Sequence, residues 1–396
     1  MFSSTGKVET INARETAPRS ATADMFGNNS KKPKPGLLIA VPGELRGYEM
    51  AHKRYGRLPW KELFEPSIKL AWDGFKIGTA LARAINDEKE KILNNIALCE
   101  VFCDSNNNTL KEHDTISFPQ LAATYRKIAK HGANAFYNGS LTQSIVDDIK
   151  AAGGNITRED LKNYTAVLSE PALSFDVGKY TFHAPTAPFG GPVFTLILKI
   201  LLGNGTEGST GYDLTNESVS TAENLTLTYH RIIEDFCLAN AEKSNLGDPL
   251  KFPIINEVIK NMITDSFADH KRSEINDSIA TACSKRHNVT NSVPDDSGTS
   301  HVSVIDAEGN AVAVTSSIND YFGSGVMSEC TGIIFNDQMS DFTQVTSEHN
   351  KIQPGKRPLS SMCPTIILDE EKENSEKVRM VVGAEGGTKL HLDYFY

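Results

Sequence analysis

The residues best placed to do chemistry are a glycine and a threonine that stand directly before a strand-like pattern. Gly298 and Thr299 precede a segment in which valines alternate with polar residues, Ser300-His301-Val302-Ser303-Val304. A threonine at the start of a chain can act as a nucleophile, because its own freed α-amine is a base beside its hydroxyl. Cleavage of the Gly298–Thr299 bond would create such a residue. The same residues could instead form an ordinary strand with one polar face, and a match of this length taken alone favours that alternative.

Two alternating segments after Thr299 predict a β-hairpin. Residues 301–305 and 311–315 have the period of strands, and the loop between them contains Gly309. A short hairpin loop of this kind needs a residue in the left-handed conformation, which glycine adopts without steric cost.

The register of this hairpin predicts which side chains lie opposite one another. Pairing the valines of the two strands puts all of them on one face, which we expect to be buried. They are Val302, Val304, Val312 and Val314. The same register places Thr299 opposite Ser317 on the other face, where opposed Cβ atoms lie about 5 Å apart. The sequence therefore predicts that Ser317 and Asn319 lie beside Thr299.

Two further segments carry polar groups that suit an anionic ligand. Ser360 and Ser361 lie between prolines, and two adjacent hydroxyls can hold a carboxylate by hydrogen bonds. Gly386 and Gly387 follow a valine-rich strand pattern, and successive backbone N–H groups in such a turn can stabilise an oxyanion. Taken alone, the first segment is better explained as an ordinary loop and the second as a glycine turn.

Together these segments resemble the gamma-glutamyltransferase family, also called gamma-glutamyl transpeptidase or glutathione hydrolase. The resemblance extends from about residue 7 to residue 389, and its motifs follow one another in the family's order. The matching motifs are INARETAP at 11–18, VPGELRGYE at 41–49, GRLPW at 56–60, AFYNGS at 135–140, AGGNIT at 152–157, NDYFGS at 319–324 and GIIFNDQMSDF at 332–342.

The resemblance implies the catalytic groups. Thr299 would be the nucleophile, released by cleavage of the Gly298–Thr299 bond, and Ser317 would support it and assist the cleavage. The backbone N–H groups of Gly386 and Gly387 would form the oxyanion hole.

The resemblance also implies the groups that bind the substrate. Arg14 would hold the α-carboxylate of a glutamyl group, a task that suits its planar fork of donors, and Ser360 and Ser361 would assist. Asp341 would hold the substrate ammonium group, with Asn319 and Gln338 nearby. Each role has a structural alternative: Arg14 could form a surface ion pair with Glu15, and Asp341 could cap a turn.

The fold class that follows is α+β, since helical patterns surround a strand-rich region. By resemblance it is the αββα sandwich of the N-terminal-nucleophile hydrolases, in an incomplete form. Cleavage would divide the chain into a large-subunit portion, 1–298, and a small-subunit portion, 299–396, which remain associated as one intertwined unit. The chain departs from the family pattern at both ends, and we expect it to be a truncated form. The N-terminal signal or membrane anchor of the family is not recognised in it, so the sequence does not indicate how it would enter the secretory pathway.

Local signals predict several helices in the first part of the chain. Pro66 and Gly74 frame one helix, and Pro119 and Gly132 frame another. A stripe of Leu141, Ile145 and Ile149 indicates a third, and the segment Thr157-Arg158-Glu159-Asp160 is typical of a capped helix start.

Composition fits an ordinary globular enzyme and excludes some other classes. The 396 residues are 39% hydrophobic and carry a formal net charge of −10, with no sustained basic cluster, so we expect no nucleic-acid partner. The spacing of cysteines and histidines suggests no zinc site, and we expect no metal or other cofactor. By resemblance to animal members of the family, Cys99 and Cys103 could form a disulfide.

Ten N-x-[S/T] sequons favour a glycosylated protein that is secreted or lies on the outer face of the plasma membrane. All ten precede Thr299. They begin at Asn28, Asn107, Asn138, Asn155, Asn163, Asn204, Asn216, Asn224, Asn276 and Asn288.

Two functions remain open from the sequence. The first is an enzyme that takes the γ-glutamyl group of glutathione or its conjugates onto Thr299 and passes it to water or to an amino acid or peptide acceptor. The second is a catalytically inactive, truncated paralogue that acts as a non-catalytic glycoprotein. Cleavage at Gly298–Thr299 would distinguish them.

Overall fold

Proline, glycine and capping residues set the ends of the first helices in the computed structural model. It describes residues 1, 5–27, 33–203, 211–212, 214–279, 298–342, 348–371 and 375–385. Helix α2 (Glu65–Asp73) has its proline in the first turn and ends at Gly74, whose φ is 82°. Helix α6 (Pro119–His131) likewise ends at Gly132, and α9 (Arg158–Asn163) begins with a capping box between Thr157 and Asp160. The predicted helices are therefore confirmed, including α8 (Thr142–Ala151).

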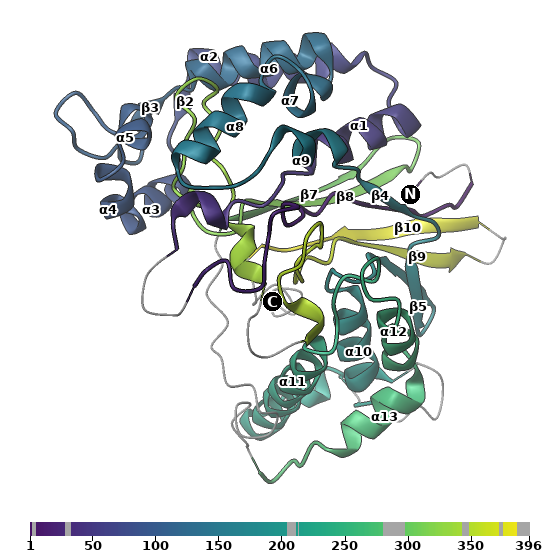
Figure 1. Cartoon of the computed structure of the whole chain (residues 1–396). Helices are drawn as coiled ribbons and strands as arrows, with labels where there is room; N and C mark the ends of the chain where they lie inside the picture. The colour runs from purple at the N-terminus through teal and green to yellow at the C-terminus, as the bar shows by residue number, and fades with distance from the viewer. Residues whose placement is uncertain are drawn as a thin grey trace.

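Helices form two outer layers with strands between them (Figure 1). In the view of Figure 1 the upper layer comes from the first part of the chain. Besides the helices named above, it contains η1 (Pro35–Leu38), α1 (Glu44–Tyr55), η2 (Trp60–Phe64), α3 (Thr79–Asp87), α4 (Lys89–Leu93), α5 (Ile96–Phe102) and α7 (Asn134–Tyr137). The lower layer contains α10 (Gly191–Leu202), η3 (Glu217–Val219), α11 (Ala222–Lys243), α12 (Ile255–Met262) and α13 (Asp265–Ser273).

The strands form antiparallel sheets. The largest has the order β10-β9-β6-β5, which brings β5 (Leu173–Val177) and β6 (Tyr180–Ala184) beside β9 (Thr365–Glu371) and β10 (Ser375–Val382). Two-stranded sheets pair β1 (Thr10–Asn12) with β4 (Val167–Ser169), β2 (Phe75–Lys76) with β3 (Thr115–Ile116), and β7 (Thr299–Ile305) with β8 (Ala311–Ser317). Short 3-10 turns, η4 (Gln338–Asp341) and η5 (Glu348–Asn350), precede β9.

Apolar side chains join these layers. Phe194 and Leu198 of α10 pack on Phe175 of β5 and so fix the lower helices to the large sheet. Ala311 of β8 packs against Ile366 of β9 in the cluster that joins the hairpin to the large sheet. The order of layers is therefore helix, sheet, sheet and helix.

The predicted hairpin register is confirmed, but the predicted burial of its valines is wrong. Val302 pairs with Val314 and Thr299 pairs with Ser317, and Gly309 in the loop has a φ of 81°. Val302 is nevertheless 52% exposed. Small alanines on the opposite face of β8 make the contact with the large sheet, so the valines lie on the outer face of the hairpin.

A buried carboxyl group lies inside the lower helical layer. Asp235 of α11 is 0% exposed, and neither carboxyl oxygen has a hydrogen-bond partner within the described part of the chain. Burial raises the pKa of this carboxyl well above its usual range, although the charge of Arg272 acts in the opposite direction. The folded chain therefore holds this proton more tightly than the unfolded chain does.

We expect Asp235→Asn to make the stability of the protein less dependent on pH. Because the folded-state pKa is raised, the wild type loses stability as the pH rises above the unfolded-state pKa of about 4. Asparagine has nearly the same shape and does not ionise. The free energy of unfolding of the variant, relative to wild type, should therefore increase by about 1 kcal/mol or more between pH 5 and pH 8.

Urea titrations at the two pH values measure this difference. Glu223→Gln is the matched control, because Glu223 is an exposed residue of the same helix. A difference between Asp235→Asn and wild type that stays constant with pH would contradict the prediction.

Candidate active site

The β7–β8 hairpin and the turn after it hold a chain of hydroxyl and carbonyl groups. Thr299 is the first residue of β7, and its Oγ1 donates to Ser317 Oγ at 3.0 Å. Ser317 Oγ in turn lies 3.4 Å from the carbonyl oxygen of Gly298, the residue before Thr299. The backbone N–H of Asn319 donates to Ser317 Oγ at 2.9 Å and fixes this hydroxyl between the two.

Gly298 occupies a position that accepts no side chain. A Cβ atom there would lie 2.5 Å from the carbonyl oxygen of Asn319 and 2.6 Å from that of Asp320. The Gly298 N–H donates to the carbonyl of Asn319 at 2.6 Å, and Asn319 has a φ of 78°. Close backbone packing therefore fixes the geometry of the Gly298–Thr299 bond.

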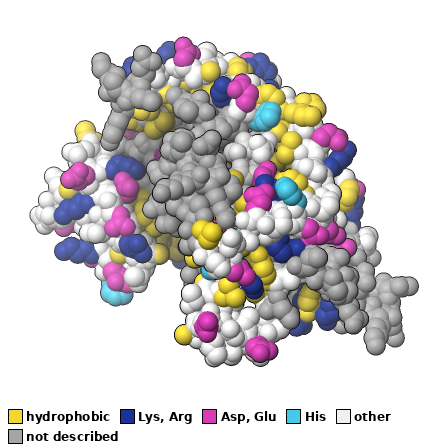
Figure 2. All heavy atoms as spheres, turned by 90° about the horizontal axis from the view of Figure 1, so that it is seen from below, with side chains coloured by type: hydrophobic (Ala, Val, Ile, Leu, Met, Phe, Trp, Pro, Cys, Tyr) yellow, Lys and Arg dark blue, Asp and Glu magenta, His cyan; other side chains and the backbone are white. Residues whose placement is uncertain are grey.

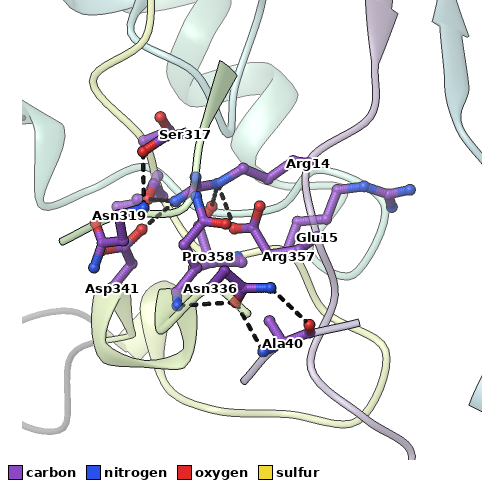
Figure 3. Close-up of polar contacts among 12 residues, drawn as sticks. Arg14, Glu15, Ala40, Ser317, Asn319, Asn336, Asp341, Arg357 and Pro358 are labelled. Atoms are coloured by element: carbon purple, nitrogen blue, oxygen red, sulfur yellow. Dashed lines mark hydrogen bonds and ion pairs between the residues drawn. The ribbon is translucent and has the colours of Figure 1, made fainter. Parts of the chain in front are cut away.

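A second cluster is organised around Arg14, which is only 5% exposed (Figure 3). Its Nη2 forms an ion pair with Asp341 Oδ2 and donates to the carbonyl of Leu359 at 2.9 Å. Its Nε lies 2.9 Å from Glu15 Oε1. Gln338 lies between these groups, where its amide can accept from Arg14 Nη1 at 2.7 Å and donate to Glu15 Oε2 at 2.9 Å.

Burial changes the acidity of both carboxyl groups beside Arg14. It raises the pKa of Glu15 to about 7 and raises the pKa of Asp341 above its usual value, while the guanidinium of Arg14 acts in the opposite direction on both. Two carboxyl groups thus compete for one guanidinium. Arg14 and Glu15 are both buried, so the alternative of a surface ion pair between them is wrong.

The two clusters lie next to each other. Asn319 Nδ2 donates to Ser340 Oγ at 3.1 Å, and Ser340 directly precedes Asp341. Figure 3 shows Ser317, Asn319, Arg14 and Asp341 grouped around one space. A cavity of about 580 Å³ runs along β8, and Arg14, Gln338 and Ser317 contribute to its lining.

Two serines complete the polar surroundings of Arg14. Ser360 and Ser361 are buried in the loop whose residues Pro358 and Leu359 accept from Arg14. Lys243, the last residue of α11, donates from Nζ to Ser361 Oγ at 2.5 Å. Sequence reasoning did not single out Lys243, because a lysine at a helix end carries no local signal of a site.

The remaining predicted residues are two glycines and two cysteines. Gly386 and Gly387 are outside the described residues, so their oxyanion role stays a prediction. Cys99 and Cys103 are disulfide-bonded, with a Cα–Cα distance of 4.8 Å, at the end of α5 in the upper layer (Figure 1).

The arrangement can bind an amino-acid group near a threonine hydroxyl. A guanidinium and a carboxylate held side by side complement the carboxylate and ammonium groups of a zwitterion. The hydroxyl of Thr299 lies in the adjoining cluster.

A family model and curated relatives indicate the same protein family for this chain. The sequence pattern of the family described as Gamma-glutamyltranspeptidase matches residues 1–391. Glutathione hydrolase 2 of Arabidopsis thaliana is 39% identical over 403 residues, which cover 97% of this chain and 66% of that protein. Scoloptoxin SSD14 of Scolopendra dehaani is 39% identical over 398 residues, which cover 98% of this chain and 66% of that protein. The chain thus spans slightly less than two thirds of the length of either relative.

Among solved structures, the cephalosporin acylase of Bacillus halodurans superposes with a TM-score of 0.80 at 23% identity. The match covers 98% of this chain and 68% of that one. At this identity the likeness speaks for the fold alone. It confirms the predicted α+β class and the arrangement of strands between two helical layers.

Proposed function

The chain belongs to the gamma-glutamyltranspeptidase family, and from this premise we propose that it transfers the γ-glutamyl group of glutathione and its conjugates. The acceptor is water or the amine of an amino acid or peptide. The observation that carries the proposal is the buried pair of Arg14 and Asp341 near Ser317, whose hydroxyl accepts from that of Thr299. Arg14 binds the α-carboxylate of the glutamyl group, Asp341 binds its ammonium group, and the γ-carbonyl then points toward the nucleophile.

Cleavage of the chain is the first chemical step. Thr299 Oγ1 attacks the carbonyl carbon of Gly298 and gives up its proton. The tetrahedral intermediate then collapses with breakage of the peptide C–N bond, which leaves the Gly298 acyl group as an ester on Oγ1 and a proton on the freed nitrogen of Thr299. Ser317 Oγ contacts both the nucleophile and this carbonyl oxygen, and the N–H of Ile318 lies 3.4 Å from the same oxygen. These donors support the charge that develops there. Water then hydrolyses the ester and leaves Thr299 with a free α-amine.

The freed α-amine acts as the base for turnover. It takes the proton of Thr299 Oγ1 as this oxygen attacks the γ-carbonyl of the donor, and it returns a proton to the leaving amine. The product of this half-reaction is a γ-glutamyl ester on Thr299. Water or an acceptor amine then attacks the ester by the reverse sequence. The N–H groups of Gly386 and Gly387 are the expected oxyanion donors.

The two portions of the chain, 1–298 and 299–396, stay together after cleavage. Strand β6 from the first portion pairs with β9 from the second, with Thr181 opposite Leu368 and Phe182 opposite Ile367. A sheet shared between the portions supports the proposal of one intertwined unit.

We propose that the protein is secreted or lies on the outer face of the plasma membrane. Every sequon asparagine that the structure describes is at least partly exposed, including Asn107, Asn138 and Asn163, so these sites are open to glycosylation. The disulfide of Cys99 and Cys103 suits the same oxidising compartment. Within the described residues, no helix combines the length and the apolar character needed to cross a membrane.

Release of 4-nitroaniline from L-γ-glutamyl-4-nitroanilide tests the proposed activity. We expect turnover by the 396-residue chain, and much slower turnover of 4-aminobutyryl-4-nitroanilide, which lacks the α-carboxylate that Arg14 binds. Glycylglycine should accelerate release if an amine acceptor competes with water. A cleaved chain that releases no nitroaniline would contradict the proposal and favour a non-catalytic protein.

A further inference from the structure

Helix α11 extends a lysine from the lower layer to the loop that carries the paired serines. Lys243 ends this helix, where a cation also suits the negative end of the helix dipole. Its Nζ donates to Ser361 Oγ at 2.5 Å, across 118 residues of sequence. Ser361 is buried, and its loop supplies two carbonyl acceptors for Arg14.

The contact with Lys243 decides how the Ser361 hydroxyl can act. An ammonium group has only donors, so the oxygen of Ser361 must accept in this hydrogen bond. The hydroxyl hydrogen of Ser361 is then left to donate to another acceptor. Within the part of the chain that the structure describes, no hydrogen bond donated by this hydroxyl is found.

The hydroxyl oxygen of Ser360 also accepts a hydrogen bond, from a different donor. Its Oγ accepts from the backbone N–H of Met362 at 3.1 Å, and its own N–H donates to the carbonyl of Pro188 at 2.8 Å. Two adjacent, buried hydroxyls thus both have their oxygens engaged by N–H donors. The hydrogen of each hydroxyl is then available to donate, and two adjacent donors fit a carboxylate.

The positive charge of Lys243 also acts on Asp341. Burial raises the pKa of the Asp341 carboxyl, and Lys243 is among the cations that act against this, after Arg14. Lys243 therefore adds positive potential on the side of the site where Arg14 and the two serines lie.

We propose that Lys243 is a positioning residue for the α-carboxylate of a γ-glutamyl substrate, acting through Ser361. This inference rests on the proposed function. It goes further because it assigns to α11, a helix of the lower layer, the task of orienting the Ser361 hydroxyl toward the substrate. A purely structural role, in which Lys243 only ties α11 to the loop, predicts a loss of stability without selectivity for the carboxylate.

The experiment compares Lys243→Met with Lys243→Arg and a control. Methionine keeps an unbranched apolar stem and removes the charge and the donors, whereas arginine restores both. Lys271→Met is the control, because Lys271 of α13 is also a partly buried lysine of the lower layer, where it pairs with Glu242 and Glu274. The assays are KM and kcat for L-γ-glutamyl-4-nitroanilide, and the inhibition constants of L-glutamate and 4-aminobutyrate, which differ only in the α-carboxylate.

We expect Lys243→Met to raise KM and the inhibition constant of L-glutamate by about tenfold. The value of kcat should change by less than about twofold, and the inhibition constant of 4-aminobutyrate should not change. Lys243→Arg should recover most of the loss, and Lys271→Met should behave as wild type.

Two results would overturn the role of Lys243 while leaving the proposed function intact. One is an unchanged KM in an active Lys243→Met variant. The other is an equal weakening of L-glutamate and 4-aminobutyrate. A wild-type chain without any turnover would instead contradict the proposed function itself, and the inference would fall with it.

Discussion

Thr299→Ala should leave the protein as one uncut chain. Wild type should instead separate into fragments 1–298 and 299–396 on a denaturing gel, and the N-terminal sequence of the smaller fragment should begin at Thr299. The reason is that the variant lacks the hydroxyl that donates to Ser317, whose own hydroxyl lies 3.4 Å from the carbonyl oxygen of Gly298. Without a nucleophile the acyl shift cannot start, so cleavage should become undetectable and transfer activity should disappear with it.

Two further variants make this result specific. Ser300→Ala removes the neighbouring hydroxyl, whose side chain lies on the other face of the strand, and should be cut at the wild-type rate. Ser317→Ala removes the hydroxyl between nucleophile and carbonyl, and should slow cleavage by roughly a hundredfold, as the loss of one oxyanion donor does elsewhere. Normal cleavage of Thr299→Ala would refute the assignment of the nucleophile.

Arg14→Ala should produce the largest loss of substrate recognition. Removing one partner of a buried charge contact costs about 2–5 kcal/mol, which corresponds to a decrease in kcat/KM of about thirtyfold to several thousandfold. The measurement is the rate of L-γ-glutamyl-4-nitroanilide release at low substrate concentration. An unchanged kcat/KM would exclude the role of Arg14 in binding the carboxylate.

Arg14 also holds the loop at Pro358 and Leu359, so a second variant is needed to separate binding from folding. Asp341→Asn keeps the shape of the side chain and removes the charge proposed to bind the ammonium group. We expect it to reduce kcat/KM for the L-γ-glutamyl donor much more than it lowers the midpoint of thermal unfolding. Arg46→Ala serves as the control, because Arg46 forms a comparable ion pair with Glu49 on α1.

The hairpin could be predicted from the sequence because its contacts are local. A glycine in the loop and alternating valines fix the register, and the register alone places Ser317 opposite Thr299. Which face of the hairpin is buried is not a local property. It depends on the alanines of β8 that pack on β9, a strand more than fifty residues later in the chain.

The binding cluster was predictable only in part, for a similar reason. Family motifs predict Arg14 and Asp341 as site residues, but their direct pairing joins positions 327 residues apart. The burial that raises the pKa of Glu15 to about 7 also arises from distant segments. Lys243 lies on a helix with no motif, so only its contact with Ser361 reveals it.

The close backbone packing around Gly298 has a consequence for the kinetics of the proposed cleavage. Among the described residues, the groups that contact the carbonyl oxygen of Gly298 are the hydroxyl of Ser317 and the N–H of Ile318, and both belong to the chain that is to be cut. Cleavage is then a unimolecular process. Its half-time should be the same in a dilute solution as in a concentrated one, and protease inhibitors should not lengthen it.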